Sequence, residues 1–284
     1  FAEHGRCVAG PVGADPCTLA LANMTGANRV LVGLGWPLVV LVAGIAVLRA
    51  RRRGDDPGPA DRVHMPRSMS AEIVFLGIAT LYSLHLPLRS SLTVLDAVVL
   101  VTIFVLYAVR LAKAPAGDPD LIGTSEWIAG QDRRRWIYIG LFAVAALVIL
   151  ASAEEFANGL VATGHELGVD QFVLVQWVAP IASEAPELIV ACLYAWRLKA
   201  GDSLGALLSS KVNQWTLLVG TIPVVFAVAS WSMSGLPLDG HQRQELLLTA
   251  AQSLFAVSIL ITLALSMRAA AVLFALFAVQ FLAS

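Results

Sequence analysis

The chain has 284 residues, of which 58% are hydrophobic and 14% are charged. An ordinary soluble domain is about half apolar and roughly a quarter charged. The composition therefore excludes a disordered chain, a nucleic-acid-binding domain and most soluble enzymes. The net charge of −1 says little as a total, and three cysteines are too few for a disulfide framework.

Apolar runs of about 20 residues recur along the chain, and each is long enough to cross roughly 30 Å of hydrocarbon as a helix. Polar breaks between these runs predict eight transmembrane helices, over residues 30–49, 70–88, 92–112, 136–156, 172–196, 212–232, 246–266 and 268–283. The predicted fold class is therefore an all-α integral membrane protein, which has the lipid bilayer as a partner.

The polar segments between these helices divide the chain into parts. Residues 1–29 are predicted to be a non-spanning segment that ends in the start of the first helix. A loop over residues 114–135, which contains several Pro and Gly residues, separates a first half (30–113) from a second half (136–284).

Basic residues alternate from loop to loop. The odd-numbered loops hold 14 Lys and Arg residues, whereas the even-numbered loops hold two. Cytoplasmic loops carry an excess of basic residues. The odd loops, including 114–135, are therefore predicted to be cytoplasmic. Both termini are predicted to lie outside, in a multi-pass protein of the inner cell membrane.

The fifth predicted helix carries an unusual polar stretch in its middle, from Ala179 to Glu187. Pro180 and Pro186 are predicted to break the helix twice and to free backbone carbonyls, which survive only beside protein or a water-filled cavity. Intramembrane carboxylates are costly and usually functional. Two carboxylates, a hydroxyl and loose carbonyls suit Na⁺, Ca²⁺ or H⁺, although a kinked helix with paired carboxylates is the alternative. The residues concerned are Ser183, Glu184 and Glu187.

The sixth predicted helix begins with a second polar group. Ser210, Asn213 and Gln214 are predicted to share one face by their three- and four-residue spacing. They could coordinate cations or form hydrogen bonds between helices. Lys211 is placed near the cytoplasmic end, where it could extend to the interface, or else pair with Glu184 or Glu187.

An internal repeat links the two halves. Thr25, Asn28, Arg29 and Gly35 have the same spacing as a hydroxyl, Asn, polar residue and Gly that begin at Ser210. The two copies start helices of opposite predicted direction. Oppositely oriented repeats with interrupted helices at the midplane are typical of secondary transporters.

These motifs resemble the α-repeats of the cation/Ca²⁺ antiporter superfamily, the sodium/calcium exchanger membrane region. The second α-repeat is matched over residues 171–223, and residues 22–29 resemble the closing half of the first. The resemblance implies an inverted-repeat exchanger fold from which the first two helices are missing. It also implies alternating access at a midplane carboxylate site, with Ca²⁺, Na⁺ or H⁺ as transported ions and no cofactor.

The resemblance also implies roles for individual residues. Glu187 is the main cation-binding carboxylate, with Glu184 beside it as a second metal ligand. The remaining cation-binding candidates are Ser183, Ser210, Gln214, Asn213, Thr25 and Asn28.

Three departures from the family pattern matter. No Pro-Glu precedes the first copy, and Arg29 stands where the family usually has Asn or Asp. Gln214 replaces a carboxylate or Asn. Because a guanidinium keeps its charge at neutral pH, an inward Arg29 would replace a cation. It would then be charge-compensating, as would Lys211, and this favours proton exchange.

Two other functions stay open at this point. One is a non-transporting remnant or partner subunit of an exchanger, which the missing half-site makes plausible. The other is an intramembrane enzyme that uses Glu184 and Glu187 as acid and base, but it lacks a nucleophile or metal motif. The leading hypothesis is therefore a cation antiporter and not an enzyme; the oligomeric state is not predicted.

Overall fold

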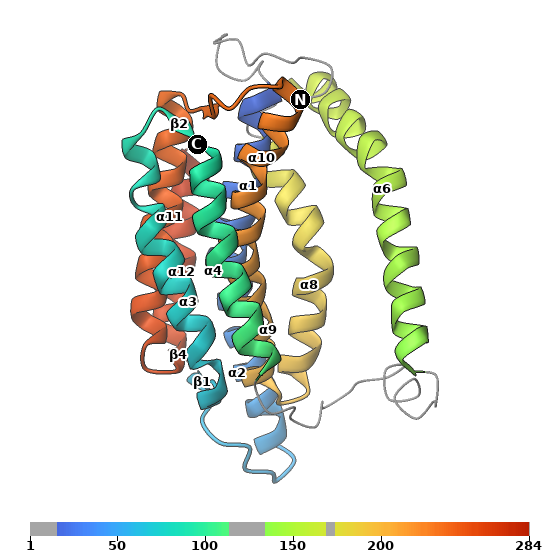
Figure 1. The fold of residues 1–284 in the computed structure, drawn as a ribbon. Coiled ribbons are helices and arrows are strands. Elements are labelled where there is room, and N and C mark those ends of the chain that lie inside the picture. The colour runs from blue at the N-terminus through green and yellow to red at the C-terminus, as the bar shows by residue number, and fades with distance from the viewer. Residues whose placement is uncertain (1–15, 114–133, 169–173, 284) are drawn as a thin grey trace. The chain divides into compact units, whose positions relative to one another are not determined.

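The computed structural model describes residues 16–113, 134–168 and 174–283 (Figure 1). The chain divides into two compact units. One comprises residues 1–112 with 170–284, and the other comprises residues 113–169. Within the described residues, the second unit is a single helix, α6 (Arg134–Leu167). Every other element below belongs to the first unit.

The first helical stretch begins earlier than predicted. It runs without a break through α1 (Pro16–Val30), a π-helix η1 (Leu31–Gly35) and α2 (Trp36–Arg51). The prediction that residues 1–29 do not span the membrane is thus wrong for residues 21–29, which belong to a helix that is long and apolar enough to cross it. Residues 1–15 lie outside the described part. Thr25, Asn28 and Arg29 misled the prediction because they are buried against protein and not exposed at a surface.

The next two helices form a hairpin, α3 (Ser70–Ser83) and α4 (Val94–Ala112). The short 3₁₀ turns η2 (Arg67–Met69) and η3 (Leu86–Leu88) flank α3. The start of α4 is held by Asp96, whose carboxylate accepts hydrogen bonds from Thr93 N at 2.7 Å and Tyr82 Oη at 2.6 Å. Arg89 adds an ion pair at 2.8 Å, so one buried carboxylate caps α4 and ties it to α3.

The Pro-containing helix is continuous, so the prediction of a helix broken at Pro180 and Pro186 is wrong. A π-helix, η4 (Leu174–Val178), leads directly into α8 (Ala179–Trp196). Pro180 lies at the junction of η4 and α8, and the stretch stays helical although this residue has no N–H to donate to the preceding turn. Pro186 lies inside the helix, and the turns on both sides of it remain helical.

The following helix is also longer than predicted. It is formed by α9 (Ala200–Asn213), the π-helix η5 (Gln214–Leu218) and α10 (Val219–Ser230). This stretch and the α1–η1–α2 stretch contain the two copies of the sequence repeat, and each copy contains a π-helix. Such π-turns are rare and are often found at functional sites.

The last two helices are α11 (Gly240–Leu260) and α12 (Met267–Ala283). Asp239 caps α11 by a capping box, in which Gln242 N donates to Asp239 Oδ1 at 2.7 Å and Asp239 N donates to Gln242 Oε1 at 2.9 Å. The predicted start at residue 246 is therefore too late. Glu245 lies inside α11 and is buried.

Two short antiparallel sheets join loops at opposite ends of the first unit (Figure 1). β1 (Arg62–His64) pairs with β4 (Ala264–Ser266), which joins the first predicted loop to the end of the seventh predicted span, next to the seventh loop. β2 (Ser91–Leu92) pairs with β3 (Leu236–Pro237), which joins the second and sixth. Each sheet thus joins loops of the same parity, as expected if odd and even loops lie on opposite sides of the membrane.

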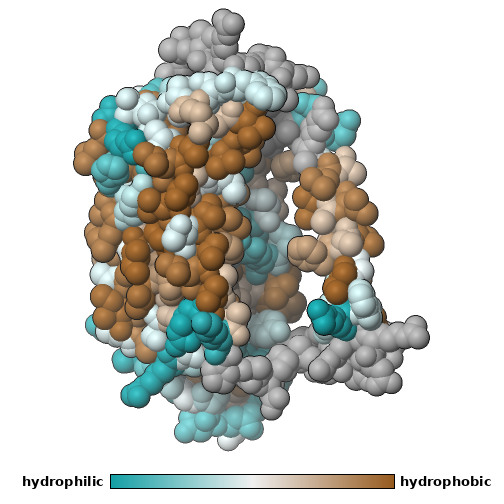
Figure 2. All heavy atoms as spheres, in the orientation of Figure 1, coloured by the Kyte–Doolittle hydropathy of each residue, from teal (hydrophilic) through white to brown (hydrophobic). Residues whose placement is uncertain are grey.

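The outer faces of the helices are suited to lipid. Among the described residues, six helices are long and apolar enough to cross a membrane, and α12 is a shorter apolar helix. Large apolar side chains such as Leu81, Leu95 and Val98 are exposed on α3 and α4. Figure 2 shows this apolar surface along the helices, with hydrophilic side chains gathered toward their ends. The predicted all-α membrane fold is confirmed.

Candidate cation site

The first feature of the site is a close crossing of α1 and η4. A Cβ at Gly26 would overlap the carbonyl oxygen of Gln176 and would lie 2.9 Å from Pro180 Cγ. Pro180 has no N–H to offer the Gln176 carbonyl four residues earlier. The glycine therefore lets the backbone of α1 approach this carbonyl, and the crossing places the polar turn 25–29 against the start of α8.

A buried carboxylate, Glu184, lies where α8 meets α9. Its Oε1 accepts a hydrogen bond from Gln214 Nε2 at 2.9 Å, and the residue is 7% exposed. Lys211 lies within electrostatic range of this carboxylate. Its Nζ donates to the Asn28 carbonyl on α1 at 3.2 Å and lies 5.0 Å from the centre of the Trp215 ring. Three helices thus contribute to one buried polar cluster.

Three oxygens of this cluster are buried and receive no hydrogen bond from the described residues: Glu184 Oε2, Gln214 Oε1 and Asn28 Oδ1. Buried polar atoms are normally paired, so each exception needs an explanation. Carboxylate and amide oxygens are typical ligands of hard cations. The cluster can therefore accept a cation or, at Glu184, a proton.

The prediction that Lys211 extends from the cytoplasmic end of its helix is wrong. The helical span begins at Ala200 and not at residue 212, so Lys211 lies well inside it. The side chain is 1% exposed. The open alternative, a pair with Glu184 or Glu187, is not formed as an ion pair among the described residues, where Lys211 Nζ instead contacts the Asn28 carbonyl and the Trp215 ring.

A second buried pair lies beside the first cluster. Arg29 on α1 is 1% exposed and forms an ion pair with Glu245 on α11. Gln176 Nε2 donates to the same carboxylate. The guanidinium carbon of Arg29 lies 4.9 Å from the centre of the Trp177 ring. Arg29 therefore points inward and balances a carboxylate, but that carboxylate is not one of the predicted residues.

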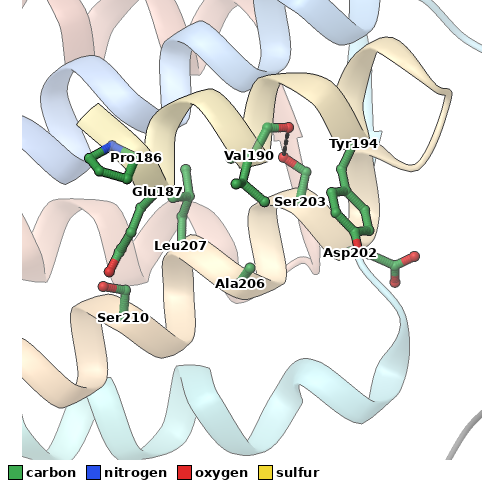
Figure 3. Close-up of a pocket in the computed structure, with 10 residues that line it drawn as sticks. Pro186, Glu187, Val190, Tyr194, Asp202, Ser203, Ala206, Leu207 and Ser210 are labelled. Atoms are coloured by element: carbon green, nitrogen blue, oxygen red, sulfur yellow. Dashed lines mark hydrogen bonds between the residues drawn. The ribbon is translucent and has the colours of Figure 1, made fainter. Parts of the chain in front are cut away.

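Glu187 lies on a different surface from Glu184. It is exposed and lines a groove of about 530 Å³ between α8 and α9 (Figure 3). In Figure 3 the Glu187 side chain extends toward Ser210, and Tyr194 and Asp202 line the other end of the groove. Glu187 and Ser210 are thus brought together, and an open path leads from them along both helices toward the α8–α9 turn.

Three predicted residues are not directed at either carboxylate. Ser183 is exposed, and its hydroxyl donates to the Pro180 carbonyl at 3.2 Å. Asn213 is exposed, although the neighbouring Gln214 is buried. Thr25 is buried, but its hydroxyl donates to the Leu21 carbonyl at 3.0 Å within its own helix.

The sequence reasoning missed the contribution of α11. Its signal was a row of polar residues at helical spacing in the seventh apolar segment. All are buried in the structure: Gln242, Glu245, Thr249, Gln252 and Ser253. Among the residues that the structure describes, no three His, Cys, Asp or Glu side chains form a group that could hold a metal ion.

A family model described as "Sodium/calcium exchanger protein" matches residues 12–113 and 137–284. Among curated proteins, "Putative antiporter CaxA" of Alkalimonas amylolytica is 25% identical over 95 residues, which are 33% of this chain and 30% of that protein. The matched part thus spans less than a third of this relative.

Two kinds of solved structure are similar in fold. The crystal structure of an H⁺/Ca²⁺ exchanger, CAX, is 42% identical with a TM-score of 0.86, over 96% of this chain and 67% of that one. The sodium-calcium exchanger NCX_Mj, soaked with Na⁺ and Sr²⁺, is 16% identical with a TM-score of 0.62, over 94% of this chain and 77% of that one. At that identity the second likeness concerns the fold alone.

Proposed function

Because this chain belongs to the sodium/calcium exchanger family, we propose that it is a secondary active antiporter, which exchanges H⁺ or Na⁺ against Ca²⁺ or another cation. The observation that carries the proposal is the buried carboxylate Glu184, whose Oε2 has no donor among the described residues, close to the similarly unpartnered Oε1 of Gln214. Glu187 and Ser210, which line the adjacent groove, complete the proposed cation-binding group.

The charges of the cluster favour H⁺ over Na⁺ as the exchanged ion. Arg29 forms an ion pair with Glu245, whereas no basic side chain of the described residues lies within ion-pair distance of Glu184 or Glu187. Of these two carboxylates, Glu187 is the exposed one and lines the groove. One such carboxylate can exchange a proton for a metal cation, whereas each additional bound Na⁺ needs further oxygen ligands. The similar H⁺/Ca²⁺ exchanger structure supports the same choice.

The groove supports a mechanism of alternating access. It leads from Glu187 and Ser210 toward Asp202, near the α8–α9 turn. That turn is the fifth loop, which carries Arg197 and Lys199 and is proposed to be cytoplasmic. We therefore assign the groove to cytoplasmic access, and closure between α8 and α9 would occlude a bound ion.

The proposed organisation follows from the same topology. Residues 30–113 and 136–284 form the two halves of opposite orientation, joined by the cytoplasmic segment 114–135. The chain is a multi-pass membrane protein, for which we propose the inner membrane of the cell and extracytoplasmic ends of residues 1–284. The bound cations are cargo.

Ion flux tests the proposal directly. The full-length protein is expressed in cells, and everted membrane vesicles are prepared from them. The pH gradient and ⁴⁵Ca²⁺ uptake are followed together in these vesicles. Glu187→Gln is expected to abolish both signals because it removes an unpaired carboxylate at nearly constant volume. Asp56→Asn, in an exposed loop, is the matched control and is expected to transport like the wild type. Equal transport by Glu187→Gln would refute the role of this carboxylate, and the absence of flux in the wild type would refute the antiporter.

A further inference from the structure

The Arg29–Glu245 pair has no part in the proposed transport cycle, yet it is among the most deeply buried charged pairs of the described residues. Arg29 is 1% exposed and the Glu245 side chain is 8% exposed. The two residues belong to helices that are distant in sequence, α1 and α11. A buried pair of this kind is weak evidence for stability, since its desolvation offsets much of its attraction. Its presence therefore asks for another explanation.

The surroundings of the guanidinium are rich in oxygen. Glu245 supplies a carboxylate, and Arg29 Nε donates to the Thr25 carbonyl at 3.4 Å. Gln252 Nε2 donates to the Arg29 carbonyl at 3.4 Å, while Gln252 Oε1 is buried without a donor from the described residues. Without the guanidinium, the Glu245 carboxylate and the Thr25 carbonyl would face one buried position, and the Gln252 amide would lie beside it at the Arg29 carbonyl.

The internal repeat identifies what this position corresponds to. Arg29 in the first copy occupies the place of Gln214 in the second copy. Gln214 is neutral and contacts the buried carboxylate Glu184. Arg29 is charged and contacts the buried carboxylate Glu245. In both copies the residue at this place contacts a buried carboxylate, on α8 in one case and on α11 in the other, and only the first copy has a positive charge there.

We propose that the guanidinium of Arg29 acts as a resident cation, which fills a monovalent-cation site formed by Glu245 and the Thr25 carbonyl. The inference deepens the proposed antiporter function, on which it rests: Arg29 excludes Na⁺ from this position between α1 and α11, so that exchange takes place at Glu184 and Glu187. A guanidinium cannot lose its proton at working pH, so the occupancy is permanent. Replacing Arg29 by a neutral residue opens the position to Na⁺, a hard cation that accepts these oxygen ligands.

Binding to purified full-length protein tests this inference without any measurement of flux. Thermal unfolding is recorded in NaCl and in choline chloride at equal ionic strength. Because a ligand that binds the folded state raises its stability, Arg29→Gln is expected to unfold several degrees higher in NaCl and to show a saturable dependence on Na⁺ concentration. Wild type and Arg29→Lys keep the resident charge and are expected to show no difference between the salts.

The double variant Arg29→Gln with Glu245→Gln is the matched control. It removes both charges, is expected to fold, and should not respond to Na⁺. Equal Na⁺ responses in wild type and Arg29→Gln would overturn the inference, and so would a response that persists in the double variant. If Arg29→Gln cannot be isolated even in NaCl while the double variant can, Na⁺ does not replace the guanidinium and the inference is wrong.

The test is separate from that of the antiporter itself. The Na⁺ response of Arg29→Gln is expected to persist when Glu187→Gln is added, because Glu187 lines the groove and does not contact Arg29. Loss of flux in Glu187→Gln alone concerns the proposed function. An absent Na⁺ response in Arg29→Gln, with flux intact in the wild type, overturns only the resident-cation inference.

Discussion

The crossing at Gly26 allows a prediction with a defined magnitude. A Cβ at this position would overlap the Gln176 carbonyl oxygen and would lie 2.8 Å from the carbonyl carbon. Carbon atoms at optimal separation are about 3.5–4.0 Å apart. The obstacle is backbone of η4 and cannot rotate away, so α1 and η4 must separate by roughly 1 Å or more. Overpacking of a dense core typically costs about 1–3 kcal/mol.

Gly26→Ala is therefore expected to lower the unfolding midpoint of the purified protein by about 2–10 °C, at the usual conversion for a chain of this size. It also moves Gln176, which contacts Glu245, and so it should loosen the buried network. The matched control is Gly77→Ala in α3, where a Cβ would make an ordinary 3.6 Å contact with Val257 Cγ1. This variant should be neutral or more stable by roughly 0.5–1 kcal/mol, because alanine favours a helix over glycine.

Thermal unfolding of both variants in the same detergent decides between the expectations. If Gly26→Ala unfolds at the temperature of Gly77→Ala or above it, then α1 and η4 do not approach as closely as described, and the argument for the crossing fails. Trp177 lies next to Gln176 in η4, so a change in tryptophan fluorescence provides a second readout of the displacement.

Three further predictions concern the ends of the helices. Asp96→Asn weakens charge-assisted hydrogen bonds from Arg89 and Thr93 and should destabilise the protein by about 1.5–3 kcal/mol, measured by thermal unfolding; an unchanged midpoint would contradict this. Asp239→Ala removes one side of a capping box and should cost about 1 kcal/mol while transport persists, and loss of flux at full stability would refute a purely structural role. A single cysteine at Ser90 should react with an impermeant maleimide in intact cells, whereas one at Asp55 should react only after permeabilisation; reaction of both from one side would overturn the predicted topology.

The helical spans could be read from the sequence because hydrophobic burial in a bilayer depends on composition and length alone. Each predicted span contains a helix over most of its described residues, although Leu92 belongs to β2 and residues 264–266 form β4. The sequence also predicts which loops share a side of the membrane, since basic residues such as those that follow Arg49 and Arg110 are retained on one side. The β1–β4 and β2–β3 pairings join loops of matching parity without any reference to charge. Two independent observations thus support one topology.

The ends of the helices were predicted less accurately than the spans themselves. Hydropathy places a helix end where polar residues begin. Polar residues that contact one another inside the helix bundle look the same in a sequence as polar residues at a helix end. Lys211, Arg29 and Glu245 were each placed at or beyond an end for this reason, and all three are buried within helices. Their polarity makes these residues candidates for the site, and the same polarity led the prediction to place them at helix ends.

The prediction of which side chains share a helix face failed for a different reason. Reading faces from three- and four-residue spacing assumes an ideal α-helix. The helices of the site contain π-turns at η1, η4 and η5, and each π-turn rotates everything beyond it relative to the α-helical pattern. Asn213 ends α9 and Gln214 begins η5, and these adjacent residues point in different directions, so one is exposed while the other is buried. No local propensity in the sequence announces these turns.

The partner of a buried basic residue can nevertheless be sought by depth. A charge inside the membrane must meet an opposite charge at the same level on a neighbouring helix. Arg29 lies near the end of α1 (Pro16–Val30), whereas Glu245 lies in the second turn of α11 (Gly240–Leu260). Distance from the helix start therefore does not show their common depth, but the ion pair between the two buried side chains does. The capping pattern Asp239-x-x-Gln242 is local and visible in the sequence. Had it been used to start the seventh helix, Glu245 would have been placed inside that helix as an acidic residue in need of a basic partner, and Arg29 would have been one of the candidates.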